Sequence, residues 1–345
     1  MEEIVYQKKQ SGFKKCVARL NSCKQSIGKR PWLVLIILGA VMVLLIALFL
    51  FVGMGNHASH ALGIRIPTVI AILIISVCVG YSTVVFQTVT NARILTPGVL
   101  GFENIYMFLN TLLVFLFYGA SGFLFNSVEG NFILSFFVMM GFSLLIFMPL
   151  LTKGSKGIYI LLLVGIILST LFASLTSFMQ FLIDPERFMT IQARMFASFS
   201  APDNLLMIIA AGIIVVSLVL APSAKKLDVI SLGRENAISL GVSHKFACLK
   251  ILIIVAALVS VSTVIAGPVM FLGLISANLA YQFIKTFKHR FVIPAAILIS
   301  AIALFAAEFF IREVVAIDIN VAVVINFFGG IYFIFLLMRE RKKEK

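Results

Sequence analysis

The sequence predicts an all-α, polytopic membrane protein with about ten transmembrane helices. Hydrophobic residues make up 61% of the 345 residues and charged residues only 12%, whereas an average soluble domain carries about a quarter charged residues. Several apolar runs also reach the roughly 20 residues that a helix needs to cross a bilayer. This composition excludes a soluble domain.

The net charge of +14 is explained by membrane topology rather than by nucleic-acid binding, and we expect no nucleic-acid partner. With the spans given below, 24 of the 28 Lys and Arg residues fall on one side of the membrane. By the positive-inside rule this side is the cytoplasm, so we expect both termini of this cell-membrane protein there, and the number of crossings is even. The opposite side receives Arg65, Arg187, Arg194 and Arg312.

The first half of the chain contains five predicted spans. Residues 1–30 form a basic segment that we expect at the inner membrane face. Residues 53–64 are predicted as an outer loop, and residues 91–100, with Pro97-Gly98, as a cytoplasmic turn. The spans are residues 31–52, residues 66–90, a third ending near Phe117, residues 132–151 and residues 158–182.

The second half adds five more spans, which completes a membrane domain over residues 31–338. It begins with an outer segment, residues 183–203, and ends in a basic cytoplasmic tail, residues 339–345. Residues 221–250 form the longest polar interruption between spans. The spans are residues 204–220, 251–266, 268–284, 291–307 and 319–338.

Two spans carry a stripe of small and polar residues at helical spacing. In a membrane such a face points at protein or water, because unpaired polar groups in hydrocarbon cost several kcal/mol. It indicates either helix packing or the lining of a translocation pathway. The second span has Ser76, Gly80, Thr83, Gln87 and Asn91, and the fifth has Ser169, Ala173, Thr176, Ser177 and Gln180.

The polar segment 221–250 carries five basic and two acidic residues. Residues 227–239 are predicted to form a short helix that is broken at Gly233 and ended by Gly241. The segment is either a solvated connector held at the lipid surface by its lysines or a docking element that transmits force from a cytosolic partner. The residues themselves leave both interpretations open.

The sequence contains no phosphate-binding loop of the GxxxxGK[ST] type and no spaced Cys/His cluster. His57 and His60 lack an acidic or Cys companion, so we expect no metal site and no directly bound cofactor. Glu103 opens the third span, where a carboxylate complements the helix dipole, although a proton relay is the alternative. With so few acids in the spans, energy for uphill transport must come from another chain.

These features resemble the FecCD-type permeases of type II ABC importers, which serve iron-siderophores, haem and cobalamin. Three ordered patterns carry the resemblance. The first is R-x-P…Q…N…P-G-x-L-G, met by Arg65, Pro67, Gln87, Asn91, Pro97, Gly98, Leu100 and Gly101. The second is LG-x-E-x-A-x-x-LGV, met by Leu232, Gly233, Glu235, Ala237, Leu240, Gly241 and Val242. The third is AGP-x-x-F-x-GL, met by residues 266–268, Phe271, Gly273 and Leu274.

The sequence also departs from the family pattern. Ala277-Asn278 replaces the family's proline-histidine, Lys288 precedes His289 where the family has an acid, and Thr68 replaces a further basic residue. This drift is similar to the branch that imports ferric catecholate siderophores through paired, non-identical permeases. The resemblance therefore implies a heterodimer with a paralogous permease, with a homodimer as the alternative.

The resemblance also implies roles for individual residues. It makes residues 227–242 the coupling element that fits a groove on two copies of a cytosolic ABC ATPase, which uses the ATP. It makes Arg65 and Arg312 the docking residues for carboxylates on an extracytoplasmic siderophore-binding protein. The coupling positions are Leu232, Gly233, Glu235, Ala237, Leu240 and Gly241.

Together these inferences predict a non-enzymatic permease subunit that imports a ferric siderophore. The expected pathway runs along the dimer interface, with Thr83, Gln87, Asn91, Ser169, Thr176 and Ser177 as lining candidates. The alternatives are a permease for haem or cobalamin and a gradient-driven secondary transporter. A lipid-modifying membrane enzyme would need a cluster of polar catalytic residues, which the sequence does not show.

Overall fold

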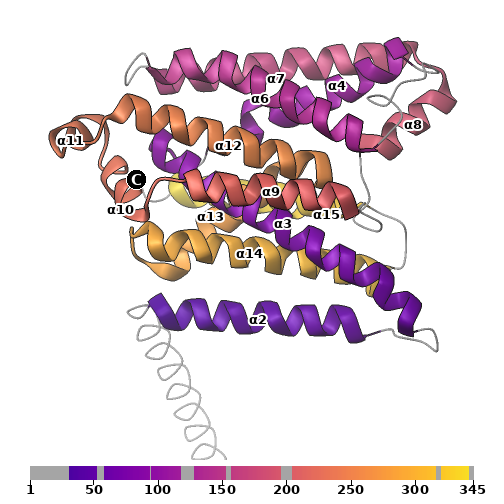
Figure 1. Cartoon of the computed structure of the whole chain (residues 1–345), viewed down its shortest axis with the longest axis horizontal. Helices are drawn as coiled ribbons and strands as arrows, with labels where there is room; N and C mark the ends of the chain where they lie inside the picture. The colour runs from indigo at the N-terminus through magenta and orange to yellow at the C-terminus, as the bar shows by residue number, and fades with distance from the viewer. Residues whose placement is uncertain are drawn as a thin grey trace, which may run out of the picture.

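The computed structural model describes residues 31–52, 58–93, 95–117, 128–152, 157–195, 204–315 and 320–341. These ranges hold helices joined by short turns and no strand, so the predicted all-α class is confirmed. Figure 1 shows the long helices lying roughly side by side, with α10 and α11 at one end of the bundle and α8 at the other. The predicted segment 1–30 and residues 342–345 of the tail lie outside the described residues.

The described elements, in chain order, begin with α2 (Pro31–Phe51), α3 (Ala58–Thr90), η1 (Gly98–Leu100), α4 (Phe102–Phe117), α6 (Val128–Thr152), α7 (Gly157–Leu182) and α8 (Pro185–Met195). They continue with α9 (Asn204–Leu220), α10 (Ala224–Ile230), α11 (Arg234–Ser239), α12 (His244–Ala266), α13 (Met270–Ile284), α14 (His289–Phe309), η2 (Phe310–Val315) and α15 (Val321–Arg341). The short element η1 is a 3₁₀ turn, and η2 is a π-helical extension of α14.

The number of spans agrees with the prediction of about ten. In the described residues, five helices are long and apolar enough to cross a membrane, or six if the bent pair α9 and α10 counts as one span. Four shorter apolar helices, in α4, α6, α13 and α15, accompany them. Short spans of this kind are possible where the bilayer adapts or neighbouring helices pack around them.

Three predicted non-membrane segments contain more helix than the hydropathy pattern indicates. The predicted outer loop 53–64 was wrong in part, because α3 begins at Ala58 and passes through Pro67. The predicted outer segment 183–203 contains the amphipathic helix α8. Residues 244–250 of the polar interruption 221–250 belong to α12, which begins at His244. Polar helical turns carry no hydropathy signal, which explains all three differences.

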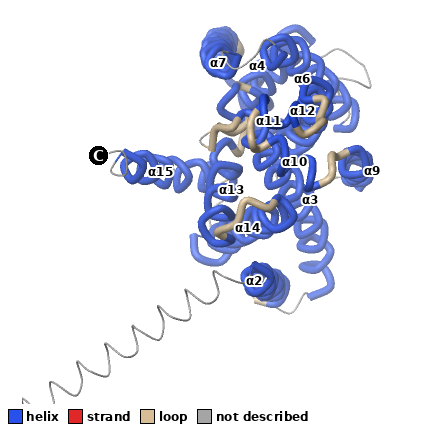
Figure 2. The backbone as a smooth tube through the Cα atoms, turned by 90° about the vertical axis from the view of Figure 1, so that its left-hand side faces the viewer, coloured by secondary structure: helices blue, strands red, loops and turns tan. Residues whose placement is uncertain are grey.

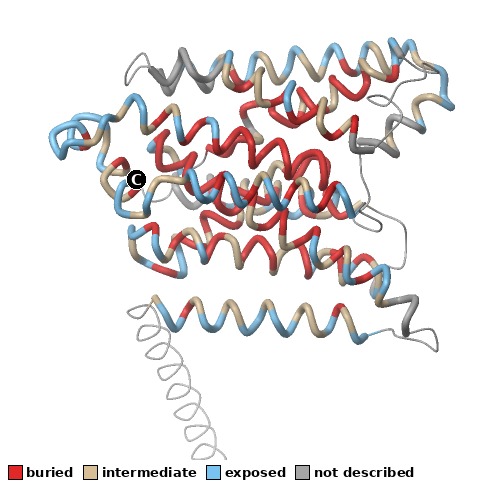
Figure 3. Tube along the Cα trace, in the orientation of Figure 1, coloured by how far each residue is buried: buried red, intermediate tan, exposed pale blue. Residues whose placement is uncertain are grey.

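The core of the bundle is built around α3 and α12 (Figure 3). In their most apolar stretches, 78% and 83% of the residues are buried, against 11% in α2 and in α7. Small residues allow the close packing: a Cβ on Gly80 would lie 2.8 Å from the backbone of Ile297 on α14. Helix pairs in membranes associate through such small residues, because apolar surface alone does not distinguish protein from lipid.

Two similar stretches of the sequence, TPGVLGF at residues 96–102 and AGPVMFLGL at residues 266–274, meet in the structure. A Cβ on Gly98 would lie 3.2 Å from Cα of Met270. Glu103 is buried in the first turn of α4, and its carboxylate lies against Gly98. The position of Glu103 at the start of the helix is the one predicted, and its end-capping role stays a prediction.

Candidate coupling and docking surfaces

The polar segment after α9 folds into two short helices rather than the single broken helix predicted over residues 227–239. The chain turns by 67° between α9 and α10. Helix α10 is held against the bundle by two buried side chains, Leu227 and Ile230, which belong to the main hydrophobic core. Helix α11 then projects beyond the end of the bundle, as Figure 1 shows.

Both glycines that were predicted to break or end the helix in this segment have a positive φ. Gly233 has φ 93° and ψ 166°, a conformation that is essentially restricted to glycine, and it caps the start of α11. Gly241 has φ 80° and ends the helix in a Schellman motif. In that motif the N–H of Val242 donates to the carbonyl of Ala237 at 3.0 Å, and the N–H of Gly241 donates to Ile238 at 2.9 Å.

The surface of α11 and its flanks is apolar as well as charged. Four of the predicted coupling positions, Leu232, Glu235, Leu240 and Gly241, are exposed, and Ala237 is the buried residue that anchors the helix. Leu232 and Leu240 are 55% and 60% exposed, and Phe246 on the first turn of α12 is 74% exposed. Because α11 lies at the polar, basic end of the bundle, lipid does not explain these exposed side chains. We call Leu232, Ile238, Leu240 and Phe246 the apical patch.

The predicted docking residue Arg65 is buried and makes intramolecular contacts. Its guanidinium donates to the carbonyl of Phe49 at 2.7 Å and to those of Leu50 and Val52 at the end of α2. It also forms an ion pair with Glu313 at 3.3 Å. Arg65 therefore satisfies the free carbonyls at a helix C-terminus, where a cation is also favoured by the helix dipole.

The second predicted docking residue, Arg312, lies in the same cluster. Its Nε donates to Oε1 of Glu308 at 2.6 Å, and its guanidinium lies 5.3 Å from the ring of Phe49. The side chain of Glu308 is almost fully buried, whereas that of Arg312 is 25% exposed. The structure thus brings Arg65 and Arg312 together around Phe49 at the end of the bundle opposite α11. Each arginine is paired with a glutamate of the same chain. Sequence reasoning missed these glutamates as partners, although Glu308 precedes Arg312 by one helical turn.

Two of the three predicted pathway residues of the second span, Thr83 and Gln87, are buried within the subunit. Thr83 is buried against α13, where a Cβ on Gly273 would clash with its hydroxyl. Gln87 is buried and donates from Nε2 to the carbonyl of Arg93 at 2.6 Å. Asn91 is exposed at the end of α3, with φ 50°. The described structure therefore brings this stripe into helix packing within the subunit rather than to a common open surface.

The predicted pathway residues on α7 divide between two faces. Ser169 accepts a hydrogen bond from Asn104 on α4 at 2.6 Å, and Thr176 is buried. Ser177 is exposed, and its hydroxyl donates to the carbonyl of Ala173. Figure 2 shows α7 at the periphery of the bundle, away from α3. The two stripes thus do not meet in one subunit.

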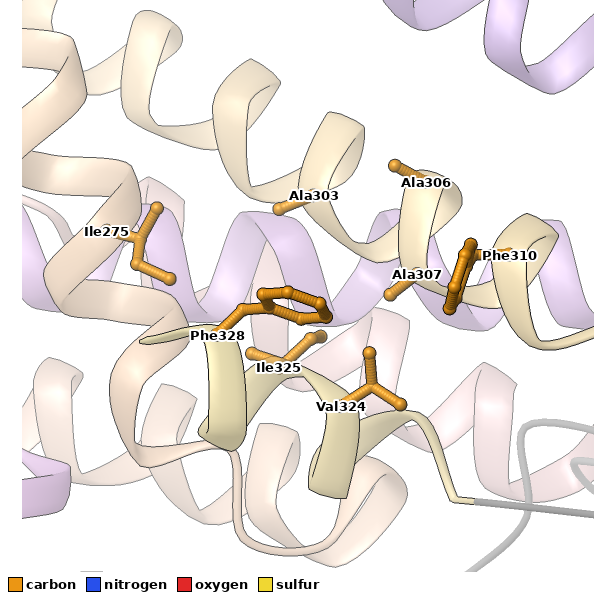
Figure 4. A pocket seen from close by; sticks show the side chains of 8 residues that line it. All are labelled: Ile275, Ala303, Ala306, Ala307, Phe310, Val324, Ile325 and Phe328. Atoms are coloured by element: carbon orange, nitrogen blue, oxygen red, sulfur yellow. The ribbon is translucent and has the colours of Figure 1, made fainter. Parts of the chain in front are cut away.

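An apolar cavity of about 330 Å³ lies between α13, α14 and α15. Figure 4 shows its lining, which includes Ile275, Ala307 and Phe328, and every labelled side chain consists of carbon atoms. It offers no side-chain donor or charge with which to hold an iron chelate. His57, one of the two histidines weighed as metal ligands, lies outside the described residues.

The fold defines the class of protein. It matches a metal-chelate type ABC transporter in an inward-facing conformation with a TM-score of 0.75, over 88% of this chain and 98% of that chain, at 21% sequence identity. The chain therefore has the fold of a type II ABC importer permease.

The chain belongs to the FecCD transport family, which matches residues 32–339. It is 43% identical to a petrobactin import system permease protein of Bacillus subtilis, over 87% of this chain and 95% of that protein. It is 38% identical to a petrobactin import system permease protein of Bacillus anthracis, over 80% of this chain and 78% of that protein. The resemblance found in the sequence is thus confirmed: the chain is a multi-pass cell-membrane permease of an ABC importer, and the family implies ATPase and binding-protein partners.

Proposed function

We propose that this permease imports a ferric siderophore of the catecholate type, with ferric petrobactin as the first candidate. The support for the substrate is the similarity to two petrobactin import permeases over most of their length. The chain itself then performs no covalent chemistry and supplies a passage. ATP is hydrolysed on separate cytosolic subunits.

The observation that carries the ATP-driven part of this proposal is the apical patch. A helix that projects from the basic end, is bounded by two positive-φ glycines and exposes Leu232, Ile238 and Leu240 is suited to insertion into a groove on another protein. Exposed Arg234 and Glu235 beside the patch supply the charges that orient such a contact. We assign this surface to the ATPase, and we therefore propose that the basic end and both termini lie in the cytoplasm.

At the opposite end we propose that Arg65 and Arg312 recognise carboxylates of the binding protein by exchanging partners. Each arginine holds a glutamate of its own chain, Glu313 and Glu308 respectively. Arg312 is the more accessible of the two, so we expect it to make the first contact. A carboxylate from the binding protein would then compete for a guanidinium that is already positioned, which lowers the entropy cost of docking.

The passage itself is proposed to lie at the interface with a second, paralogous permease. Helix α7 presents exposed hydroxyls at Thr170, Ser174 and Ser177 among apolar residues. Each hydroxyl donates to a carbonyl of its own helix, so the stripe is only weakly polar. A bulky chelate that must pass without being trapped needs such a surface. Among the lining candidates from the sequence, Ser177 fits this role, whereas Thr83, Gln87, Ser169 and Thr176 contact helices of their own subunit.

The test is uptake of radiolabelled iron, supplied as ferric petrobactin, in cells with and without this gene. Cells with a phosphate-binding-loop mutant of the partner ATPase are compared in parallel. Loss of uptake in both mutants is the expected result. Loss in the permease mutant alone, together with collapse under an uncoupler, would instead identify a gradient-driven carrier.

Normal petrobactin uptake in both mutants would contradict the substrate assignment while leaving the family membership intact. The same cells would then be supplied with ferric hydroxamates, haem and cobalamin. A strain that expresses this permease without its paralogous partner tests the heterodimer: uptake in that strain would indicate a homodimer.

A further inference from the structure

Three elements that are distant in the sequence meet at one buried histidine. His289, the first residue of α14, is only 3% exposed. Its Nδ1 lies 2.6 Å from Oδ1 of Asp228 on α10, 61 positions away. Its Nε2 lies 2.7 Å from Oγ1 of Thr88 on α3, 201 positions away. The imidazole ring therefore joins the helix before α11 to two helices of the membrane bundle.

The chemistry of the three groups determines which atom donates and which accepts in these contacts. An ionised carboxylate only accepts hydrogen bonds, so Nδ1 of His289 carries a proton and donates it to Asp228. The hydroxyl of Thr88 has one hydrogen, which it can donate either to an unprotonated Nε2 or to the carbonyl of Val84 at 2.8 Å; in the second case it accepts a hydrogen bond from a protonated Nε2. Asp228 also accepts the backbone N–H of His289 at 2.8 Å. The carboxylate thus binds both the side chain and the helix N-terminus of α14.

A short stretch of backbone links these contacts to the apical patch. Only residues 231–233 separate α10 from α11, and two backbone hydrogen bonds, from Leu232 to Val229 and from Gly233 to Ile230, keep this link short. The apolar contacts of Leu227 and Ile230 hold α10 against the bundle, but such contacts have no preferred direction. The hydrogen bonds from Asp228 through His289 to Thr88 each have a preferred direction and length. A displacement of α10 is therefore transferred through them to α14 and α3 together.

We propose that Asp228, His289 and Thr88 are positioning residues that transmit movement of the coupling element into the membrane helices. This inference rests on the proposed docking of the apical patch on the ATPase. A purely structural alternative is that Asp228 only caps α14. The two explanations make different predictions for Thr88, because this residue takes no part in a cap of α14 but completes the connection to α3.

The decisive variant is Thr88→Val, which removes a buried hydroxyl with little change in shape. Thr90→Val is the matched control. Thr90 is likewise buried on α3, and its hydroxyl lies within hydrogen-bond distance of the carbonyl of Phe86, as that of Thr88 lies within reach of the carbonyl of Val84. In the described contacts only Thr88 also meets His289. Any general effect of losing a hydroxyl from α3 is therefore shared by both variants.

The complete importer, with its partner permease, ATPase and binding protein, is reconstituted in liposomes and supplied with ferric petrobactin. The readout is the number of ATP molecules hydrolysed per iron imported, calculated per assembled complex. We expect Thr88→Val to raise this number about three- to tenfold, the change in an equilibrium expected for the loss of one ordinary intramolecular hydrogen bond. Thr90→Val should leave it within about twofold. Equal values for the two variants would overturn the inference.

A second readout does not depend on the substrate. Hydrogen exchange of the detergent-solubilised importer is compared with and without a non-hydrolysable ATP analogue. Wild type and Thr90→Val should change protection at the ends of α3 and α14 near His289, and Thr88→Val should lose the change in α3. Absence of any change in wild type would also overturn the inference. Failure of wild type to import ferric petrobactin would contradict only the proposed substrate.

Discussion

The two ends of the bundle present their recognition residues in opposite ways. At the basic end, α11 carries exposed apolar and charged side chains on a projecting helix. At the other end, Arg65 and Arg312 are already paired with glutamates and carbonyls of the same chain. The basic end is thus a preformed docking surface, whereas contact at the other end requires existing ion pairs to open.

This difference has a physical consequence for partner lifetime. An exposed apolar surface gains free energy on burial without giving up contacts. An arginine that leaves one carboxylate for another gains little net energy, although charge still guides encounter. We therefore expect a lasting complex with the ATPase and a transient one with the binding protein.

The largest effect is expected from Arg65→Gln. It removes the donor to three carbonyls at the end of α2 and the partner of Glu313. Because these groups are largely buried, we expect a loss of about 2–3 kcal/mol of stability. Thermal unfolding of the purified complex in detergent measures it. Arg187→Gln, which breaks an exposed ion pair with Asp184, is the control and should cost less than about 1 kcal/mol. Equal losses would mean that Arg65 is not a structural residue.

The next largest effect is expected from Gly233→Pro. Proline fixes φ near −65°, whereas Gly233 has φ 93° and donates its N–H to Ile230. The apical patch should be misdirected, and uptake should fall by about tenfold or more with the complex still folded. Gly241→Asn is the matched control, because asparagine tolerates the left-handed conformation. Uptake retained in Gly233→Pro would remove the docking role of α11.

A smaller effect is expected from Glu308→Gln at the opposite end. Loss of the carboxylate frees Arg312, so affinity for the binding protein should rise a few-fold, and more at low salt. Arg312→Gln should lower the affinity to a similar extent. Surface plasmon resonance with the reconstituted complex measures both. If neither variant changes the affinity, Arg312 does not dock the binding protein.

The smallest effect is expected from Lys225→Gln and Lys226→Gln, which are exposed on α10 near the basic end. If the apical patch, rather than charge at the lipid surface, carries the function of this segment, uptake should change by less than about twofold. A large loss would favour the alternative in which the segment is a connector held at the membrane by its lysines.

Local patterns in the sequence were sufficient to predict much of the fold. Residues 204–220 were predicted to the residue as a helix, and Gly233 and Gly241 were correctly placed at breaks in the segment after it. These features depend on hydropathy and on backbone conformations that glycine adopts more readily than other residues, and both are local properties of the chain. The family patterns added the coupling and docking hypotheses, which remain predictions.

The surroundings of the candidate residues were not predictable in the same way. The stripe with Thr83 and Gln87 and the stripe with Ser177 have the same helical spacing, yet the first is buried and Ser177 is exposed. Hydropathy cannot distinguish these faces, because lipid and the apolar core are equivalent surroundings for a side chain. The burial of Arg65 was missed for a related reason: its partners are backbone carbonyls, which carry no residue-specific signal.

The sequence by itself determined the class of this protein: an all-α bundle of about ten spans, with basic residues on one side and a glycine-bounded polar segment between spans. Each of these follows from composition or from short-range pattern. Only the tertiary structure decided which side chains meet. The contact of Asp228, His289 and Thr88 joins residues that are 61 and 201 positions apart. Such a contact depends on how whole helices pack, which no local pattern encodes.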